Sequence, residues 1–162
     1  MVNLDDLYRE ILLDHYRNPR NRGPLDAANA SADGSNPLCG DEITLELRLD
    51  DDGRIADAAF SGQGCSISQA SSSLMTEYVK GRSSDEATSA IDAFQAMMVE
   101  GEDAPEDLGD IGALAGVRKF PMRVKCASLA WKTLEVALAQ HDRDDDAHRA
   151  KVTTDERSTL NG

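Results

Sequence analysis

Residues 39–49 read CGDEITLELRL, and this stretch decides the fold. From Ile43 onward, apolar side chains alternate with polar ones, which is the period of a strand with one buried face. The acidic turn 50–53 follows, and residues 54–61 then predict the antiparallel return strand of a hairpin. On the other side, residues 25–37 are small and polar, which is compatible with either a loop or a short edge strand.

Helical patterns surround this hairpin. Residues 4–16 repeat apolar side chains at spacings of three and four, and Asn18-Pro19 ends the pattern. Residues 66–80 predict a helix with Ser66 as N-cap and Gly81 beyond its end. Further helical stretches are expected at 85–100 and 121–140, with short helical turns over 108–117. The predicted fold class is α+β, a small antiparallel sheet of about three strands with helices packed on one face.

The chain divides unevenly into a domain and a tail. Residues 1–140 carry the periodic patterns and predict one domain, which suits a length of 162 residues. Residues 141–162 lose the periodicity and include three consecutive aspartates, Asp144 to Asp146. They predict an acidic, disordered C-terminal tail.

The net charge of −13 restricts the class of partner. Such a surface repels nucleic acid and anionic membranes, and no apolar run approaches the roughly 20 residues that span a bilayer. The first residues lack a secretory signal, so we expect a cytoplasmic protein. Residues 83–117 contain nine acidic residues and no Lys or Arg. This segment is either a solvated acidic surface or a docking face for a basic partner.

The three cysteines are Cys39, Cys65 and Cys126. An odd number without a signal peptide argues against a disulfide framework. Cys39 and Asp41 are two residues apart at the mouth of a strand, where alternate side chains point the same way, and zinc accepts both ligand types. By spacing alone, metal ligands, a catalytic thiol and small buried core residues all remain open.

The surroundings of the other two cysteines favour thiolates. Cys65 directly precedes a predicted helix N-terminus, which stabilises anions, and Gly64 before it permits a close backbone approach. Cys126 follows Arg123 and Lys125, and nearby cations are expected to favour its ionised form.

Three other features are assigned structural roles. His15 is expected to be a packed or capping histidine, residues 71–73, which are all serine, to mark close helix packing, and Trp131 to anchor the core. No histidine is paired with the serines, so serine hydrolase chemistry lacks a base.

Four motifs, in the same order along the chain, resemble those of the U-type iron–sulfur cluster assembly proteins. They are residues 7–21, 36–41, 62–68 and 125–131, and the resemblance spans residues 4–140. In the scaffold branch of that family, a histidine precedes the third cysteine and the interval before it is shorter. Here Lys125 takes that place and the chain before Phe120 is longer. Both features resemble the SufU branch, whose members are zinc-dependent sulfurtransferases.

The resemblance implies a complete site. It assigns one Zn²⁺ per chain to Cys39, Asp41, Cys65 and Cys126, and makes Cys39 the catalytic sulfur acceptor. It implies a SufS-like cysteine desulfurase as partner, whose histidine replaces Cys39 on the metal, and a downstream cluster assembly scaffold as a further partner.

Two alternatives from other classes remain. One is a scaffold that assembles a [2Fe–2S] cluster on the same cysteines, which Lys125 in place of histidine argues against. The other is an adaptor whose zinc is purely structural. A zinc hydrolase is disfavoured, because four protein ligands leave no position for water.

Overall fold

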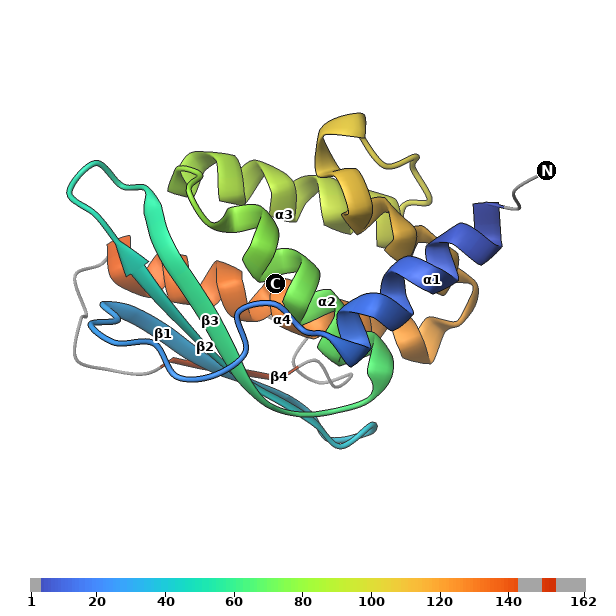
Figure 1. The fold of residues 1–162 in the computed structure, drawn as a ribbon, viewed down its shortest axis with the longest axis horizontal. Coiled ribbons are helices and arrows are strands. Elements are labelled where there is room, and N and C mark those ends of the chain that lie inside the picture. The colour runs from blue at the N-terminus through green and yellow to red at the C-terminus, as the bar shows by residue number, and fades with distance from the viewer. Residues whose placement is uncertain (1–3, 143–149, 154–162) are drawn as a thin grey trace.

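The sheet is built around the predicted hairpin. In the computed structural model of the chain, which describes residues 4–142 and 150–153, β1 (Ala30–Asn36), β2 (Asp41–Leu49) and β3 (Ile55–Gln63) form an antiparallel meander. A short fourth strand, β4 (Ala150–Thr153), pairs parallel to β1, so the strand order is β3-β2-β1-β4 (Figure 1). The predicted three-stranded antiparallel sheet is confirmed, with one strand added at its edge.

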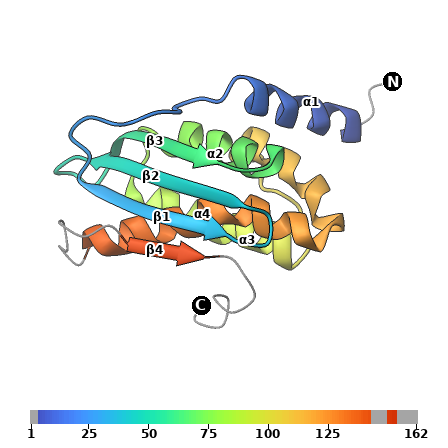
Figure 2. The same cartoon turned by 90° about the horizontal axis from the view of Figure 1, so that it is seen from below.

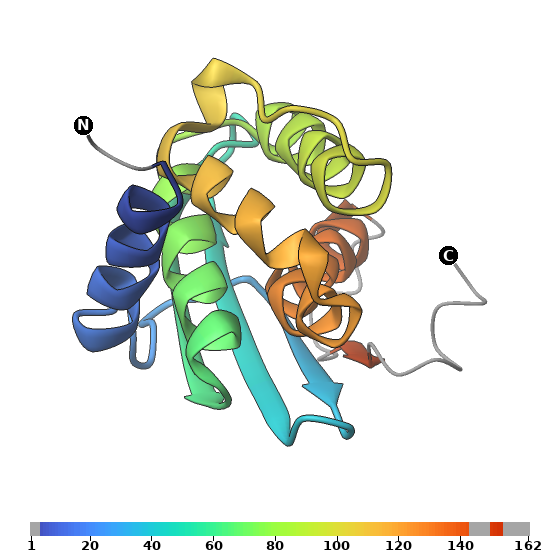
Figure 3. The ribbon, with the colours of Figure 1, turned by 90° about the vertical axis from the view of Figure 1, so that its right-hand side faces the viewer.

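The helices cover one face of this sheet, as predicted. They are α1 (Leu4–Arg17), α2 (Ser66–Val79), α3 (Ser84–Val99), the 3-10 helix η1 (Glu106–Lys119) and α4 (Pro121–Asp142). Figure 3 shows α2 and α4 directly on the sheet, α1 beside α2, and α3 with η1 as an outer layer. The fold is therefore α+β, with helices α2 and α4 directly on the sheet and α3 and η1 outside them.

The composition of β1 reflects the close approach of α4. Ala30 and Ala32 are buried, and a Cβ added at Gly34 would lie 2.2 Å from the Thr133 side-chain oxygen. Only small residues allow a helix backbone this near to a strand. The ambiguity over residues 25–37 is thus resolved as a strand that is small because α4 lies against it.

Both edges of the three-stranded meander are covered. At the β3 edge, Gly23 donates to the Phe60 carbonyl at 2.8 Å, and the Phe60 amide donates to Asn21 at 2.9 Å. At the other edge, β4 pairs with β1 (Figure 2). Covering the edges satisfies backbone groups that would otherwise be free to pair with another chain.

The C-terminal segment differs from its prediction where the structure describes it. Helix α4 continues to Asp142, and residues 150–153 form β4 rather than a disordered stretch. The reason is that the β1 edge offers unpaired backbone donors and acceptors, which a four-residue sequence pattern does not reveal. The rest of the predicted tail, residues 143–149 and 154–162, lies outside the described residues.

The structural roles given to His15, the serines and Trp131 are confirmed. His15 is buried with its Nδ1 2.8 Å from Ser73 Oγ, and its burial lowers the pKa of the imidazole. The serines at 71–73 are buried between helices, and Trp131 is fully buried and stacked on Phe94 with ring centres 4.7 Å apart. Among the described residues, no helix has the length and apolar character needed to cross a bilayer.

Candidate metal centre

The four predicted ligands come from four separate segments. Cys39 lies in the turn between β1 and β2, and Asp41 begins β2. Cys65 directly precedes α2, and Cys126 lies in the second turn of α4. The fold brings these segments together although Cys65 and Cys126 are far apart in the sequence.

Cys39 and Asp41 converge through a tight turn rather than through extended chain. The Cys39 amide donates to the Asn36 carbonyl at 3.1 Å, and Gly40 has a φ of 69°. That left-handed conformation suits glycine and lets the chain reverse between the two ligands. The prediction that their side chains converge is correct, but its extended-strand reason is wrong.

The donor atoms lie within reach of a single ion. The Cys39 Sγ, one carboxylate oxygen of Asp41 and the Cys126 Sγ all lie within 4.8 Å of one another. The Cys39 and Cys126 sulfurs are 3.1 Å apart. The Cys65 Sγ lies 3.9 Å from Asp41 Oδ2, on the border of that group. The structure therefore groups two sulfurs and one carboxylate, and it places the Cys65 sulfur beside Asp41 but outside that group.

Asp41 is the most constrained of the four. Its side chain is only 1% exposed, and its Oδ1 accepts the Cys65 amide at 2.8 Å. A Cβ added at Gly64 would lie 2.7 Å from this same Oδ1 and 2.6 Å from Ser68 Oγ. The absence of a side chain at Gly64 thus leaves the room in which the carboxylate sits.

Cys65, and not Ser66 as predicted, is the N-cap of α2. Its backbone is extended (φ −70°, ψ 170°), and its Sγ accepts the Ser68 amide at 3.5 Å. Ser66 is already helical and forms the first residue of α2. The Cys65 sulfur therefore faces the free amides of the first helical turn, the place next to the helix N-terminus that the sequence predicted for it.

Cys126 behaves differently from its prediction. Its side chain is completely buried, and this burial, with hydrogen bonds to Cys39 and Asp41, raises the pKa of the thiol well above its usual value. The expected effect of nearby cations is therefore outweighed by desolvation and by neighbouring negative groups. Bound metal would reverse this preference, because a coordinating thiol is deprotonated by the ion.

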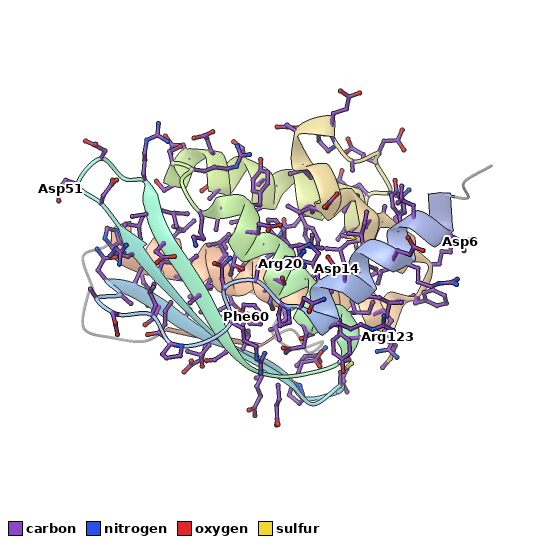
Figure 4. All side chains as sticks on the ribbon, viewed as in Figure 1. Asp6, Asp14, Arg20, Asp51, Phe60 and Arg123 are labelled. Atoms are coloured by element: carbon purple, nitrogen blue, oxygen red, sulfur yellow. The ribbon has the colours of Figure 1, made fainter. Side chains whose placement is uncertain are left out.

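Two polar side chains lie at the site but were not among the predicted ligands: Arg123, expected only to favour ionised Cys126, and Asn36. Arg123 lies beside the Cys65 thiol, and its electrostatic interaction and hydrogen bond with Cys65 raise the pKa of the guanidinium, with smaller contributions from Cys126 and Cys39. Figure 4 labels Arg123 at the start of α4, on the side of the molecule where α1 lies. The fully buried Asn36 places its Nδ2 4.0 Å from Cys126 Sγ. Arg123 lies three residues before Cys126, one helical turn away on α4. This spacing is the sequence feature that could have placed Arg123 at the site.

The donor set fits zinc. Structural zinc sites are tetrahedral and use cysteine sulfur, histidine nitrogen and carboxylate oxygen. Here two sulfurs and one carboxylate are grouped, and the Cys65 sulfur beside Asp41 would be the fourth donor. Two sulfurs on a tetrahedral zinc, each at about 2.3 Å, lie about 3.8 Å apart. The Cys39 and Cys126 sulfurs are closer than this, at 3.1 Å, so the two would move apart on binding the ion.

Comparison with known proteins agrees with this geometry. A zinc-dependent sulfurtransferase SufU from Bacillus subtilis (strain 168) is 50% identical over 142 residues, covering 87% of this chain and 95% of that protein. An iron–sulfur cluster assembly scaffold protein IscU from Streptococcus pyogenes serotype M1 is 43% identical over 158 residues, covering 93% and 98%. The crystal structure of a nitrogen-fixing NifU-like protein (N-terminal) from Brucella abortus superposes with a TM-score of 0.79 at 30% identity, covering 86% and 97%.

A family model extends these pairwise similarities over most of the chain. The model of the NifU-like N terminal domain matches residues 7–146. That range contains all four clustered side chains, from Cys39 to Cys126. The fold class, the order of motifs and the grouped cysteines agree with this match, and the chain belongs to the family of NifU-like N-terminal domains.

Proposed function

We propose that this protein is a zinc-dependent sulfurtransferase that accepts persulfide sulfur from a cysteine desulfurase for iron–sulfur cluster assembly. The observation that carries the proposal is the gathering of Cys39, Asp41 and Cys126, with Cys65 beside Asp41. These side chains would hold one zinc ion, which would keep three thiolates ionised and protected. The 50% identity to a protein named as a zinc-dependent sulfurtransferase supports the same conclusion.

Cys39 is the thiol best placed to accept sulfur. It is partly exposed in a short turn, next to Leu38, which is 57% exposed. Cys126 is buried inside α4, and Cys65 is held at the α2 cap. A turn residue can leave the metal and reach a partner with little rearrangement, whereas a helix-interior residue cannot.

The transfer step is a thiol–persulfide exchange. The Cys39 thiolate attacks the terminal sulfur of the partner's cysteine persulfide, a new sulfur–sulfur bond forms, and the old one breaks. The partner's cysteine leaves as a thiolate, and Cys39 carries the persulfide. No external oxidant or reductant is needed, because the oxidation state moves with the transferred sulfur.

A Cys39→Ala variant tests the assignment. We expect it to abolish stimulation of the cognate cysteine desulfurase, measured as alanine released from cysteine, and to form no persulfide detectable by mass spectrometry. Ser89→Ala is the control, since it changes an exposed residue of α3 and leaves the thiol and its turn unaltered. Full stimulation by Cys39→Ala would refute the role of Cys39.

The scaffold function remains the second candidate, because a relative at 43% identity is named as a scaffold protein. The metal content and visible spectrum of the purified protein separate the two. One zinc per chain without colour supports the sulfurtransferase. Iron, sulfide and visible absorption would support a [2Fe–2S] scaffold. The cytoplasmic location, the downstream scaffold partner and the role of the acidic 83–117 segment stay predictions.

A further inference from the structure

A large groove begins beside the metal centre. It has a volume of about 880 Å³ and lies between α1, the start of α2, and the junction of η1 with α4. Its wall is mostly apolar, with Leu12 and Leu13 from α1 and Val117 from η1. An apolar groove between helices is a common binding place for a partner's amphipathic segment.

The groove is continuous with the cysteine cluster. Ser66, which lines it, follows Cys65 directly, and Arg123, which also lines it, lies beside the Cys65 thiol. Met122, another lining residue, places its carbonyl oxygen 3.6 Å from Cys126 Sγ. A partner segment in the groove would therefore lie next to the sulfur-accepting site.

The groove's rim exposes apolar side chains. Phe120 is 59% exposed and Met122 is 58% exposed, and both line the groove. Leu38, in the Cys39 turn, is exposed to a similar degree. Large apolar side chains grouped around a reactive site mark a surface for protein contact.

The charge of the groove is opposite to that of the whole chain. Its lining includes Arg9, Lys119 and Arg123, and none of the described residues that line it is an aspartate or glutamate. The full chain has a net charge of −13. The ion pair of Arg9 with Asp6 is long, at 3.9 Å, and both side chains are mostly exposed. A cationic groove on an acidic protein selects for an acidic ligand.

We propose that this groove binds an acidic, apolar segment of the partner that delivers the sulfur. The inference rests on the proposed function, since it names the docking site of that partner. The segment's apolar side chains would cover Leu12, Leu13 and Phe120, and its carboxylates would face Arg9 and Arg123. Binding there holds the partner's persulfide close to Cys39.

Gly116 allows a direct block of the groove. It lines the groove, and a Cβ added there meets no atom within 4 Å. Gly116→Phe is expected to fill the groove and weaken binding of the cognate desulfurase at least about tenfold by calorimetry. Ser89→Phe on the exposed face of α3 is the matched control and should bind as the wild type does. Zinc content and melting temperature of both variants verify the fold.

A charge reversal tests the electrostatic part without risk to the core. Arg9→Glu changes an exposed residue of the groove, and we expect several-fold weaker binding, mainly through a slower on-rate and a reduced salt dependence. Arg48→Glu on β2 makes the same change of net charge away from the groove and should have little effect. Equal affinity of Gly116→Phe, Arg9→Glu and wild type would overturn the groove assignment.

A photo-crosslinking residue at position 116 identifies the occupant. We expect a crosslink to an acidic, apolar peptide of the desulfurase, mapped by mass spectrometry. A crosslink to a second copy of this chain, or to a basic peptide, would refute the inference while leaving the proposed function intact. If wild-type protein neither binds nor stimulates the desulfurase, the proposed function fails and the groove inference fails with it.

Discussion

Asp41 shows how single residues define the candidate site. Its carboxylate is buried, grouped with the thiols of Cys39 and Cys126 and close to that of Cys65. A buried carboxylate is costly unless hydrogen bonds and a positive charge compensate it. The Cys65 amide supplies one hydrogen bond at 2.8 Å. A bound cation would supply the charge, which explains why an acidic residue is stable at this position.

Gly64 is expected to control the position of that carboxylate. In Gly64→Ala, the new methyl group would overlap Asp41 Oδ1 and Ser68 Oγ, so these side chains must shift from their present positions. We expect zinc affinity to fall about 10- to 100-fold, as for loss of a ligand's support, in a chelator competition assay. Gly116→Ala, at an open position, is the control and should retain wild-type affinity. Unchanged affinity in Gly64→Ala would show that Asp41 does not ligate the metal.

At the scale of the elements, a buried hydrogen-bond chain locks α2 to α4. Ser71 Oγ donates to the Ala127 carbonyl at 2.6 Å and accepts the Trp131 indole N–H at 3.1 Å. Both helices carry ligands near these contacts, Cys65 at the α2 cap and Cys126 next to Ala127. The packing of two helices therefore sets the distance between two ligands.

Replacing this serine should cost more than replacing its neighbour. Ser71→Ala leaves the Trp131 N–H and the Ala127 carbonyl unpaired in the core, and we expect a loss of about 1–3 kcal/mol in the free energy of unfolding. Ser72 is also buried, but among the described residues its Oγ bonds only to the Ser68 carbonyl within α2. Ser72→Ala should cost less than about 1 kcal/mol. Equal losses in denaturant unfolding would contradict the cross-helix role of Ser71.

Across the whole molecule, the site joins the sheet to both helices that cover it. The β1–β2 turn, the start of β2, the α2 cap and α4 each carry one of the four proposed ligands. An ion bound to all four is absent from the unfolded chain, so its binding adds directly to the stability of the fold.

Removal of the metal should therefore lower the melting temperature. With free zinc at about 100 times its dissociation constant, the metal contributes about 2.7 kcal/mol to stability. We expect chelation to lower the Tm by several degrees in calorimetry, and added zinc to restore it. In the Asp41→Ala variant, the difference in Tm between the zinc-bound and the chelated protein should be smaller. A melting temperature unaffected by chelation would exclude a structural contribution from the site.

Most helices and strands could be predicted, because the repeat of their apolar residues is visible within a short stretch of sequence. The alternation from Ile43 to Leu49 predicts β2 with one buried face, and the spacing-of-three-and-four patterns predict α1, α3 and α4. The four candidate ligands also came from sequence, through motif order and residue chemistry. Hydrophobic periodicity and short motifs depend only on residues close together in the chain, so a single sequence is enough to read them.

What only the tertiary structure decided depends on contacts between distant segments. The 25–37 stretch became a strand because α4 lies against Gly34, and β4 formed because the β1 edge was available to it. Burial inside the packed helices raised the pKa of Cys126 against the effect expected from its sequence neighbours. The sequence by itself determined which elements and donors exist, whereas desolvation and long-range packing, which have no local period, decided how they meet.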